Sequence, residues 1–278
     1  MSTVAILGLG LIGGSLARDL AAAGMEVIGY DRARETMRAA RASGVLTDVL
    51  GPDLQGLEDI DYVVLAVPVS AAPRLLEQAA PRMQSTLLIM DVGSTKRMIC
   101  AQADDLDLGA RFVGAHPFAG DHRSGWNASR SGLFADARVF LCPVRGTRSA
   151  VLERAHALWR RVGGRPEVID AATHDERLAW SSQLPQLASS ALALALAGAG
   201  LPHHELGTGG RDATRLAGSD PELWTGVVLE NAEHASRALA ALEQHVADLR
   251  SHIESRNEAG VRAAFGRALR WSYTENGG

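Results

Sequence analysis

A short apolar run followed by three spaced glycines opens this chain and constrains its fold more than any other feature. Val4–Leu7 has the composition of a buried strand, and Gly8, Gly10 and Gly13 follow in a G-x-G-x-x-G arrangement. The next residues, 12–23, are compatible with a helix. Strand, tight turn and helix in this order predict the first unit of a doubly wound α/β fold.

The glycine turn also predicts a dinucleotide site. Gly8 allows the tight turn, Gly10 lets a pyrophosphate approach the backbone, and Gly13 lets the helix pack close to the strand. The helix N-terminus, at Leu11 and Ile12, offers unpaired N–H groups and a partial positive charge to the phosphates. The alternative is a strand–turn–helix unit that binds no ligand.

Asp31 ends the second predicted strand, Glu26–Tyr30, and indicates which dinucleotide binds. An acidic side chain there accepts hydrogen bonds from ribose hydroxyls and repels a 2′-phosphate, which favours NAD over NADP. Arg32 weakens this argument, because an arginine just past that position can pair with a 2′-phosphate or stack on the adenine. We expect Val67 and Pro68, at the end of a later strand, to line the same site.

Composition excludes several classes of protein. The chain has 278 residues and a net charge of −4, so it lacks the basic field that nucleic acid or an anionic membrane attracts. No apolar run reaches the roughly 18 residues of a membrane span, and the start lacks the basic region of a signal peptide, so we expect a cytoplasmic protein. Cys100 and Cys142 form no metal or redox spacing, and we expect no metal site.

Strand-like and helix-like segments continue to alternate through the first half of the chain. The predicted strands cover 61–67, 86–90, 111–115 and 138–142. The alternation predicts a Rossmann-like, doubly wound parallel sheet, whose sites lie at the carboxyl ends of the strands. We expect one crevice to contain the residues that follow these ends, namely Gly8, Asp31, Pro68, Asp91 and His116.

Helical periodicity dominates the rest of the chain. We therefore predict a nucleotide-binding domain at 1–165 and an all-helical domain at 166–278. Capping-box spacing at Thr173 starts a helix that Pro185 kinks, and Pro221 stands in the first turn of a later helix. The last long helix carries an apolar stripe, which predicts a core or a homodimer seam through Leu239, Leu242, Val246, Leu249 and Ile253.

Three side chains are candidates for chemistry. His116 follows a predicted strand, and its unperturbed pKa of about 6.5 suits proton transfer near neutrality. Ser94 follows the preceding strand, where it is either a hydrogen-bonding partner or a helix cap. Arg215, after a glycine-rich turn, is either a clamp for a substrate carboxylate or one half of a surface salt bridge.

Taken together, these segments resemble the prephenate/arogenate (cyclohexadienyl) dehydrogenase family of tyrosine biosynthesis. The resemblance covers nearly the whole chain and rests on Gly8–Ser15, Asp91–Lys96, His116–Gly120 with Ser124-Gly125, His174-Asp175, and Gly209–Ala217 leading to Ser219–Trp224. It implies an NAD-dependent oxidative decarboxylation of a cyclohexadienol. By the same resemblance, His116 accepts the proton of the ring hydroxyl, Ser94 orients that hydroxyl, and Arg215 binds a substrate carboxylate.

Two departures from the family pattern bear on the substrate. Gln183 and Gln186 stand where many members have histidines that contact substrate, so these contacts keep hydrogen bonding but lose a titrating charge. Asp121 and His122 follow Phe118–Gly120, where other members have different polar or acidic residues. A carboxylate at Asp121 could pair with the ammonium group of arogenate, which prephenate lacks.

Two other functions compete with this interpretation. One is another Rossmann reductase with a helical second domain, such as a hydroxyacid dehydrogenase or an imine reductase. Hydroxyacid dehydrogenases of that kind use a lysine in the helical domain, whereas Lys96 is the only lysine of this chain. The other is a redox sensor that binds NAD(H) without turnover and has no need of His116 or Arg215.

Overall fold

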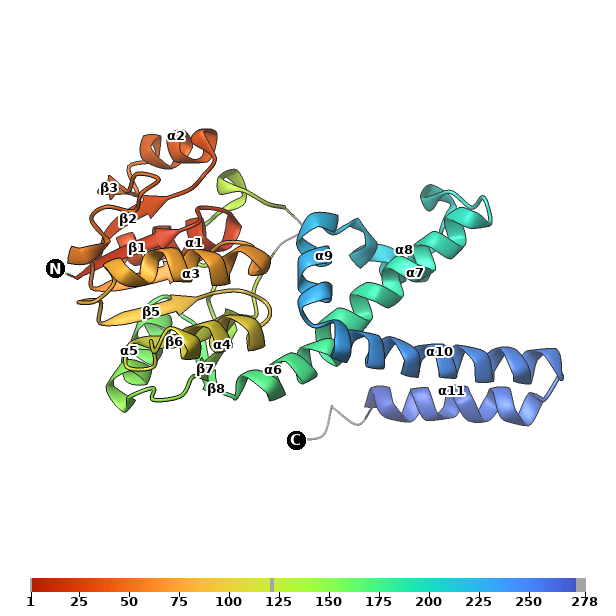
Figure 1. Cartoon of the computed structure of the whole chain (residues 1–278). Coiled ribbons are helices and arrows are strands. Elements are labelled where there is room, and N and C mark those ends of the chain that lie inside the picture. The colour runs from red at the N-terminus through yellow and green to blue at the C-terminus, as the bar shows by residue number, and fades with distance from the viewer. Residues whose placement is uncertain (1, 121–122, 274–278) are drawn as a thin grey trace.

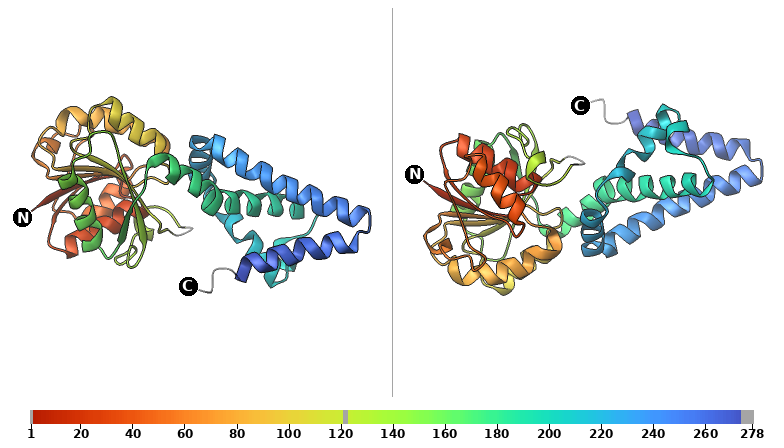
Figure 2. Two further views of the ribbon diagram at one scale, coloured as in Figure 1. Left: turned by 90° about the horizontal axis from the view of Figure 1, so that it is seen from below. Right: turned by 90° about the horizontal axis from the view of Figure 1, so that it is seen from above.

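The computed structural model describes residues 2–120 and 123–273. It has two parts: a sheet covered by helices, and an elongated group of helices that extends away from it (Figure 1). Two further views show the same separation, with the chain passing between the parts at helix α6 (Figure 2). The described residues include no helix that is both long enough and apolar enough to cross a membrane. Asp121 and His122 lie outside the described residues.

The first part is built on a sheet of eight strands in the order β3-β2-β1-β4-β5-β6-β7-β8. The strands from β3 to β6 run parallel, and the order reverses direction beside β1, as in a doubly wound fold. The bounds are β1 Thr3–Leu7, β2 Glu26–Tyr30, β3 Asp48–Val49, β4 Tyr62–Leu65, β5 Leu88–Asp91, β6 Phe112–Pro117, β7 Arg138–Pro143 and β8 Arg165–Val168.

Helices cover both faces of this sheet, because its central strands are apolar on both sides. Along β1, Val4 and Ile6 belong to one hydrophobic core and Ala5 and Leu7 to the other. The first core includes side chains of α1 and α5, and the second includes side chains of α3 and α4. The helices are α1 Leu11–Ala22, α2 Arg34–Ala42, α3 Ala72–Ala79, α4 Arg97–Asp105 and α5 Ser149–Arg161. The predicted α/β class is confirmed.

Two strands run against the prediction of a parallel sheet. β7 pairs antiparallel with β6, and β8 then pairs parallel with β7. No α-helix lies between Pro117 and Arg138 in the described residues, so the chain returns along the neighbouring strand without a helical crossover. His116 also lies inside β6 rather than after it, paired with Phe140 of β7.

The glycine turn has the geometry that its spacing predicts. Gly8 has a φ of +104°, and a Cβ there would lie 2.3 Å from the carbonyl oxygen of Ala66. A Cβ on Gly13 would lie 2.0 Å from the carbonyl oxygen of Gly8. At Gly10, by contrast, a Cβ would meet no described atom within 4 Å. Packing therefore requires glycine at Gly8 and Gly13, whereas the space beside Gly10 is open.

The second part is helical, as predicted. Its elements are α6 Ala171–Leu178, a π-helical turn Ala179–Gln183, α7 Leu184–Gly198, α8 Thr208–Thr214, a 3-10 turn Arg215–Gly218, α9 Pro221–Glu230, α10 Ala232–Glu254 and α11 Glu258–Tyr273. Asp170, not Thr173, caps α6, because its carboxylate accepts the N–H of Thr173. The irregularity expected at Pro185 is the π-helical turn just before it, since proline has no N–H for the carbonyl four residues earlier.

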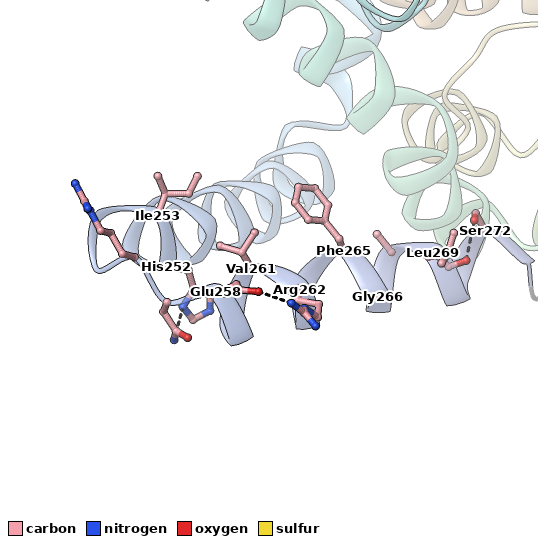
Figure 3. A pocket seen from close by; sticks show the side chains of 12 residues that line it. His252, Ile253, Glu258, Val261, Arg262, Phe265, Gly266, Leu269 and Ser272 are labelled. Carbon is pink, nitrogen blue, oxygen red and sulfur yellow. Dashed lines mark hydrogen bonds and ion pairs between the residues drawn. The ribbon is translucent and has the colours of Figure 1, made fainter.

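Helices α10 and α11 form a hairpin whose apolar side chains are largely uncovered. The predicted stripe on α10 includes Val246 and Ile253, which are 57% and 64% exposed. On α11 no residue is buried, and Phe265 is 66% exposed. Ile253, Val261, Phe265 and Leu269 help to line a groove of about 1010 Å³ on this hairpin (Figure 3). Leu239, Leu242 and Leu249 are half-buried, so the stripe is only partly covered within the described chain.

The glycine contacts predict losses of stability of different size for two matched substitutions. Gly13→Ala is expected to lower the free energy of unfolding by about 1–3 kcal/mol, because the new methyl group must displace backbone. Gly10→Ala is expected to cost less than about 1 kcal/mol, since only its preference as a helix cap is lost. Urea denaturation of both variants checks this, and equal losses would contradict it.

Candidate active site

The carboxyl ends of the parallel strands bring the predicted dinucleotide-binding residues together. The Gly8 N–H donates to the carbonyl of Tyr30 at 2.7 Å, which joins the ends of β1 and β2. A Cγ of Val67 lies 3.0 Å from where a Cβ of Gly8 would stand, so the end of β4 adjoins the same turn. Pro68 is exposed and stands directly after Val67. The glycine turn and the segment after β4 therefore form one surface.

Asp31, which directly follows β2, forms hydrogen bonds that hold the glycine turn in place. One carboxylate oxygen accepts the Leu9 N–H at 2.9 Å, and the other accepts the Ala33 N–H at 2.8 Å. Each oxygen keeps a further lone pair that could accept from a ribose hydroxyl. Arg32 is exposed beside it. Asp31, the predicted determinant of the dinucleotide, thus also supports the turn that is predicted to bind it.

The start of helix α1 fits a pyrophosphate. Gly10 is its N-cap and supplies no side chain to satisfy the first N–H groups, and the first turn carries no acidic residue. Those N–H groups, at Leu11 and Ile12, lack a partner within the helix. With the open space beside Gly10, they form an uncapped helix N-terminus of the kind that binds phosphate groups.

His116 stands at one end of a line of three buried polar side chains, with His174 in the middle and Asp175 at the other end. Its Nδ1 lies 2.9 Å from Nε2 of His174, and Nδ1 of His174 lies 2.7 Å from a carboxylate oxygen of Asp175. His116 is 8% exposed, and His174 and Asp175 are almost fully buried. The ring of Phe140 packs against both imidazoles. The three side chains connect β6 of the sheet to α6 of the helical domain.

Burial governs the proton affinity of both histidines. It lowers the pKa of His116 well below the ordinary value of 6.5, and nearby His174 and Lys96 lower that pKa further. Burial also lowers the pKa of His174, although its hydrogen bond to Asp175 opposes this change. His116 is therefore neutral at pH 7 and offers a lone pair rather than a charge.

Asp175 also caps helix α4 in the other domain. Its two carboxylate oxygens accept the N–H groups of Lys96 and Arg97 at 2.8 and 2.9 Å. A carboxylate at this position satisfies N–H groups that have no partner within the helix and complements the positive end of its dipole. The Asp175 carbonyl accepts from the Asn231 side chain at 2.7 Å, which adds the start of α10 to the same joint.

Lys96, the only lysine of the chain, forms a buried ion pair with Asp91 at the end of β5. Its ammonium group also donates to the carbonyl of Ala115 at 2.7 Å, beside His116. The Asp91 carboxylate accepts the N–H groups of Gly93 and Ala115 as well. A buried charge pair of this kind is tolerated only where further hydrogen bonds offset the loss of water, and these contacts supply them. The pair fixes the ends of β5 and β6 against each other.

Ser94 lies in the turn between β5 and α4, half-buried. The two residues that follow Ser94 are fixed by hydrogen bonds. Thr95 donates to the Glu230 carboxylate of α9 at 2.6 Å, and the Lys96 N–H donates to Asp175. Burial raises the pKa of Glu230, an effect that the hydrogen bond from Thr95 partly offsets. The helical domain therefore helps to hold the turn that carries Ser94.

Arg215 lies in the 3-10 turn that follows α8, with an exposed side chain. Within 2–120 and 123–273 it forms no ion pair, so the predicted alternative of a salt bridge to Asp212 or Asp220 is not found there. Gln186 fixes this turn: its amide donates to the carbonyl of Leu216 at 2.8 Å and accepts from Ser219. The guanidinium is thus presented by a fixed segment.

Gln183 and Gln186 were predicted to contact substrate, and the structure places both in buried positions with protein partners. Gln183 is 1% exposed, and its side-chain carbonyl accepts a hydrogen bond from the side-chain amide of Asn231 at 3.0 Å. Gln186 is 5% exposed and joins α7 to the turn of Arg215. Asp121 and His122 lie outside the described residues. The described residues contain no group of three His, Cys, Asp or Glu side chains placed to hold a metal ion.

Four residues of this site were not assigned a role from the sequence. His174 and Asp175 were noted only as part of the family resemblance, and Asn231 and Glu230 not at all. Their contacts join segments up to 135 positions apart, so no local spacing reveals them. The one available signal was the adjacent histidine and aspartate at the start of the first helix of the second domain.

These features define a class: a dinucleotide-binding domain whose strand ends face a buried histidine, closed by a helical domain. Comparison with protein families gives the particular case. Residues 16–168 match the family model "Prephenate dehydrogenase, nucleotide-binding domain", and residues 170–267 match "Prephenate dehydrogenase, dimerization domain". The chain belongs to the prephenate dehydrogenase family. It is an oxidoreductase of the prephenate and arogenate dehydrogenase type.

Individual relatives agree with this assignment. The cyclohexadienyl dehydrogenase of Zymomonas mobilis is 33% identical over 89% of this chain and 86% of its own length. The structure of Aquifex aeolicus prephenate dehydrogenase with hydroxyphenyl propionate and NAD+ matches with a TM-score of 0.89 and 28% identity, covering 98% of this chain and 97% of that one. Synechocystis arogenate dehydrogenase matches with a TM-score of 0.82 and 29% identity, covering 98% and 100%.

The competing reductases share only the fold. A 3-hydroxyisobutyrate dehydrogenase of Mycobacterium tuberculosis and an imine reductase of Streptomyces aurantiacus each match with a TM-score of 0.55, at 16% and 20% identity. Likeness at this level shows that the arrangement of domains is common to several reductases. It says nothing of a shared substrate.

Proposed function

We propose that this protein catalyses the NAD-dependent oxidative decarboxylation of prephenate, arogenate or both, with His116 as the base. The observation that carries this proposal is the place of His116, neutral and buried at the end of β6, in a chain of this family. Hydride loss from a ring carbon that bears a hydroxyl requires an acceptor for the hydroxyl proton. His116 is the side chain in the crevice best suited to accept it.

NAD is the cofactor that these residues fit. The uncapped N-terminus of α1 would hold the pyrophosphate, and Asp31 would accept the ribose hydroxyls and disfavour a 2′-phosphate. The Aquifex aeolicus relative, whose structure is described with NAD+, supports this preference. When bound, NAD supplies the hydride acceptor.

The chain's own residues manage the proton. His116 accepts it from the ring hydroxyl through Nε2, because Nδ1 is turned to His174. The hydride and the carboxylate both leave the ring, while the hydroxyl oxygen stays on the phenol product. The proton held by His116 therefore returns to that oxygen, and no net proton is released. Ser94, in the neighbouring turn, orients the hydroxyl toward His116.

Arg215 binds a substrate carboxylate from the side of the helical domain. A guanidinium forms two parallel hydrogen bonds with a carboxylate, and that of Arg215 has no ion-pair partner in the described chain. Gln186 acts on substrate through Arg215, since it fixes the turn on which Arg215 stands. This assigns Gln186 a positioning role in place of the direct contact suggested by the family pattern.

The choice between prephenate and arogenate depends on the side chain of each substrate. Relatives of this chain carry both names, prephenate dehydrogenase and arogenate dehydrogenase. Arogenate has an ammonium group where prephenate has a keto oxygen. We assign recognition of that ammonium group to Asp121, with His122 next to it in the sequence after Phe118–Gly120.

The enzyme is also proposed to be a homodimer through its helical domain. The groove on the α10–α11 hairpin is lined by apolar side chains that nothing in the described chain covers. A second copy of the hairpin has the matching apolar surface, as a two-fold interface requires. The matched family model, a dimerization domain over residues 170–267, spans the same helices.

A substitution at His116 tests the function directly. The wild-type protein is expected to form NADH when mixed with NAD and either prephenate or arogenate. His116→Asn is expected to lower kcat by at least about 10²-fold, since general base catalysis contributes 10²–10⁴-fold. Because burial lowers the pKa of His116, wild-type kcat/KM is expected to hold constant down to pH 6.5 and to fall only below it. Initial rates measured across pH check both expectations.

Cofactor binding is the control for this experiment. The dissociation constant of NAD is expected to be the same in His116→Asn and the wild type, because the imidazole lies at the reacting end of the crevice. A near-wild-type kcat in the variant would remove His116 from its role. NAD binding without turnover of either substrate would instead favour a redox sensor over an enzyme.

Two nearby arginines provide a matched pair for the substrate clamp. Arg215→Ala is expected to raise the KM of substrate about tenfold or more with a smaller change in kcat, as expected when a charge-assisted hydrogen bond is lost. Arg211→Ala, one helical turn away, removes an exposed side chain that bonds to the Leu206 carbonyl, and KM is expected to stay unchanged. Steady-state kinetics of both variants test this assignment. Equal KM values in the two variants would show that Arg215 does not bind substrate.

A further inference from the structure

We propose that His174 and Asp175 form a hydrogen-bond relay that fixes His116 in one tautomer, with the proton on Nδ1 and a bare Nε2 facing the substrate. The relay makes His174 and Asp175 positioning residues rather than catalytic ones, since neither touches the reacting atoms. Its catalytic consequence rests on the proposed function, whereas the tautomer itself does not.

The direction of each hydrogen bond follows from the acceptor at the end of the line. The Asp175 carboxylate already accepts two backbone N–H groups, from Lys96 and Arg97, and an ionised carboxylate has no proton to donate. Nδ1 of His174 must therefore be the donor in the 2.7 Å contact with Asp175. A neutral imidazole with a proton on Nδ1 can only accept at Nε2.

The same reasoning gives the direction of the hydrogen bond between His174 and His116. His174 Nε2 is an acceptor, so Nδ1 of His116, 2.9 Å away, must donate to it. Both imidazoles are neutral at pH 7, because burial lowers the pKa of each. With its one proton on Nδ1, His116 keeps its lone pair on Nε2. This is the nitrogen that must accept the proton of a ring hydroxyl.

The relay also holds the ring in place. Phe140 packs against His174 with ring centroids 5.3 Å apart and against His116 with centroids 6.3 Å apart. Asp175 cannot turn away without leaving the start of α4 uncapped. The orientation of His116 is thus fixed by a carboxylate that belongs to the joint between the domains.

When His116 takes a proton on Nε2, no proton needs to travel along the relay. The imidazolium donates from Nδ1 to His174 more strongly than the neutral ring does, and the Asp175 carboxylate lies two hydrogen bonds away from the new charge. The proton returns to the phenol oxygen as the product forms.

Histidine nitrogen NMR tests the tautomer in the full-length protein. Spectra of protein labelled with ¹⁵N-histidine, assigned for His116 by comparison with His116→Asn, are expected to show Nδ1 protonated and Nε2 unprotonated at pH 7. His174→Phe keeps an aromatic ring beside Phe140 but removes the acceptor. The proton of His116 is then expected to shift partly or wholly from Nδ1 to Nε2, the nitrogen that carries the proton in the preferred tautomer of a free, neutral histidine side chain.

Kinetics of the same variants test the consequence. His174→Phe is expected to lower kcat at least about tenfold with KM and the NAD dissociation constant little changed, because a wrong tautomer cannot accept the hydroxyl proton. His174→Gln, whose amide can both donate to Asp175 and accept from His116, is expected to recover the tautomer and part of kcat. His156→Phe, a histidine of α5 outside the site, is expected to leave both unchanged.

The outcomes separate the relay from the function. A proton on Nε2 of His116 in the wild type, or the same tautomer in wild type and His174→Phe, would overturn the relay whatever the enzyme does. A shifted tautomer with unchanged kcat would overturn its role in catalysis. If neither prephenate nor arogenate turns over, the proposed function fails, and the NMR spectra still decide the tautomer.

Discussion

The Asp175 carboxylate is the interaction on which the joint between the two domains depends. It lies at the first helix of the helical domain, yet two of its three hydrogen bonds cap helix α4 of the nucleotide-binding domain. The third goes to His174 and, through it, to His116. The contact that fixes the domains together is therefore the contact that orients His116, the proposed base. A carboxylate this deeply buried is stable only because N–H donors surround it.

The polar residues beneath the site follow from closure of one domain over the strand ends of the other. Burial of His116 keeps the imidazole neutral, and Asp91 and Lys96 are buried beside the same strand ends. These two charges neutralise each other and bond to the backbone at the ends of β5 and β6. Burial that would otherwise destabilise the fold is offset by this pairing, and burial of His116 keeps it in the neutral form that the proposed mechanism needs.

Local signals explain what the sequence predicts well. The glycine turn, Asp31 at the end of β2 and His116 near the end of β6 each lie within a few residues of the strand that positions them. The contacts of His174 with His116, and of Glu230 with Thr95, join residues 58 and 135 positions apart, which no spacing rule detects. The direction of β7 was wrong because the pattern shows a strand but not its partner. Helix α11 was not predicted, and no residue of it is buried in the described chain.

A structure of the enzyme with NAD and a phenolic product analogue tests the central claim most directly, because it fixes both ends of the substrate at once. We expect the ring hydroxyl to lie within hydrogen-bond distance of His116 Nε2. Nδ1 of the same ring is expected to remain bonded to His174, and a ligand carboxylate is expected to pair with Arg215. A ring hydroxyl bound away from His116, or a His116 ring turned so that Nδ1 faces the ligand, would contradict it.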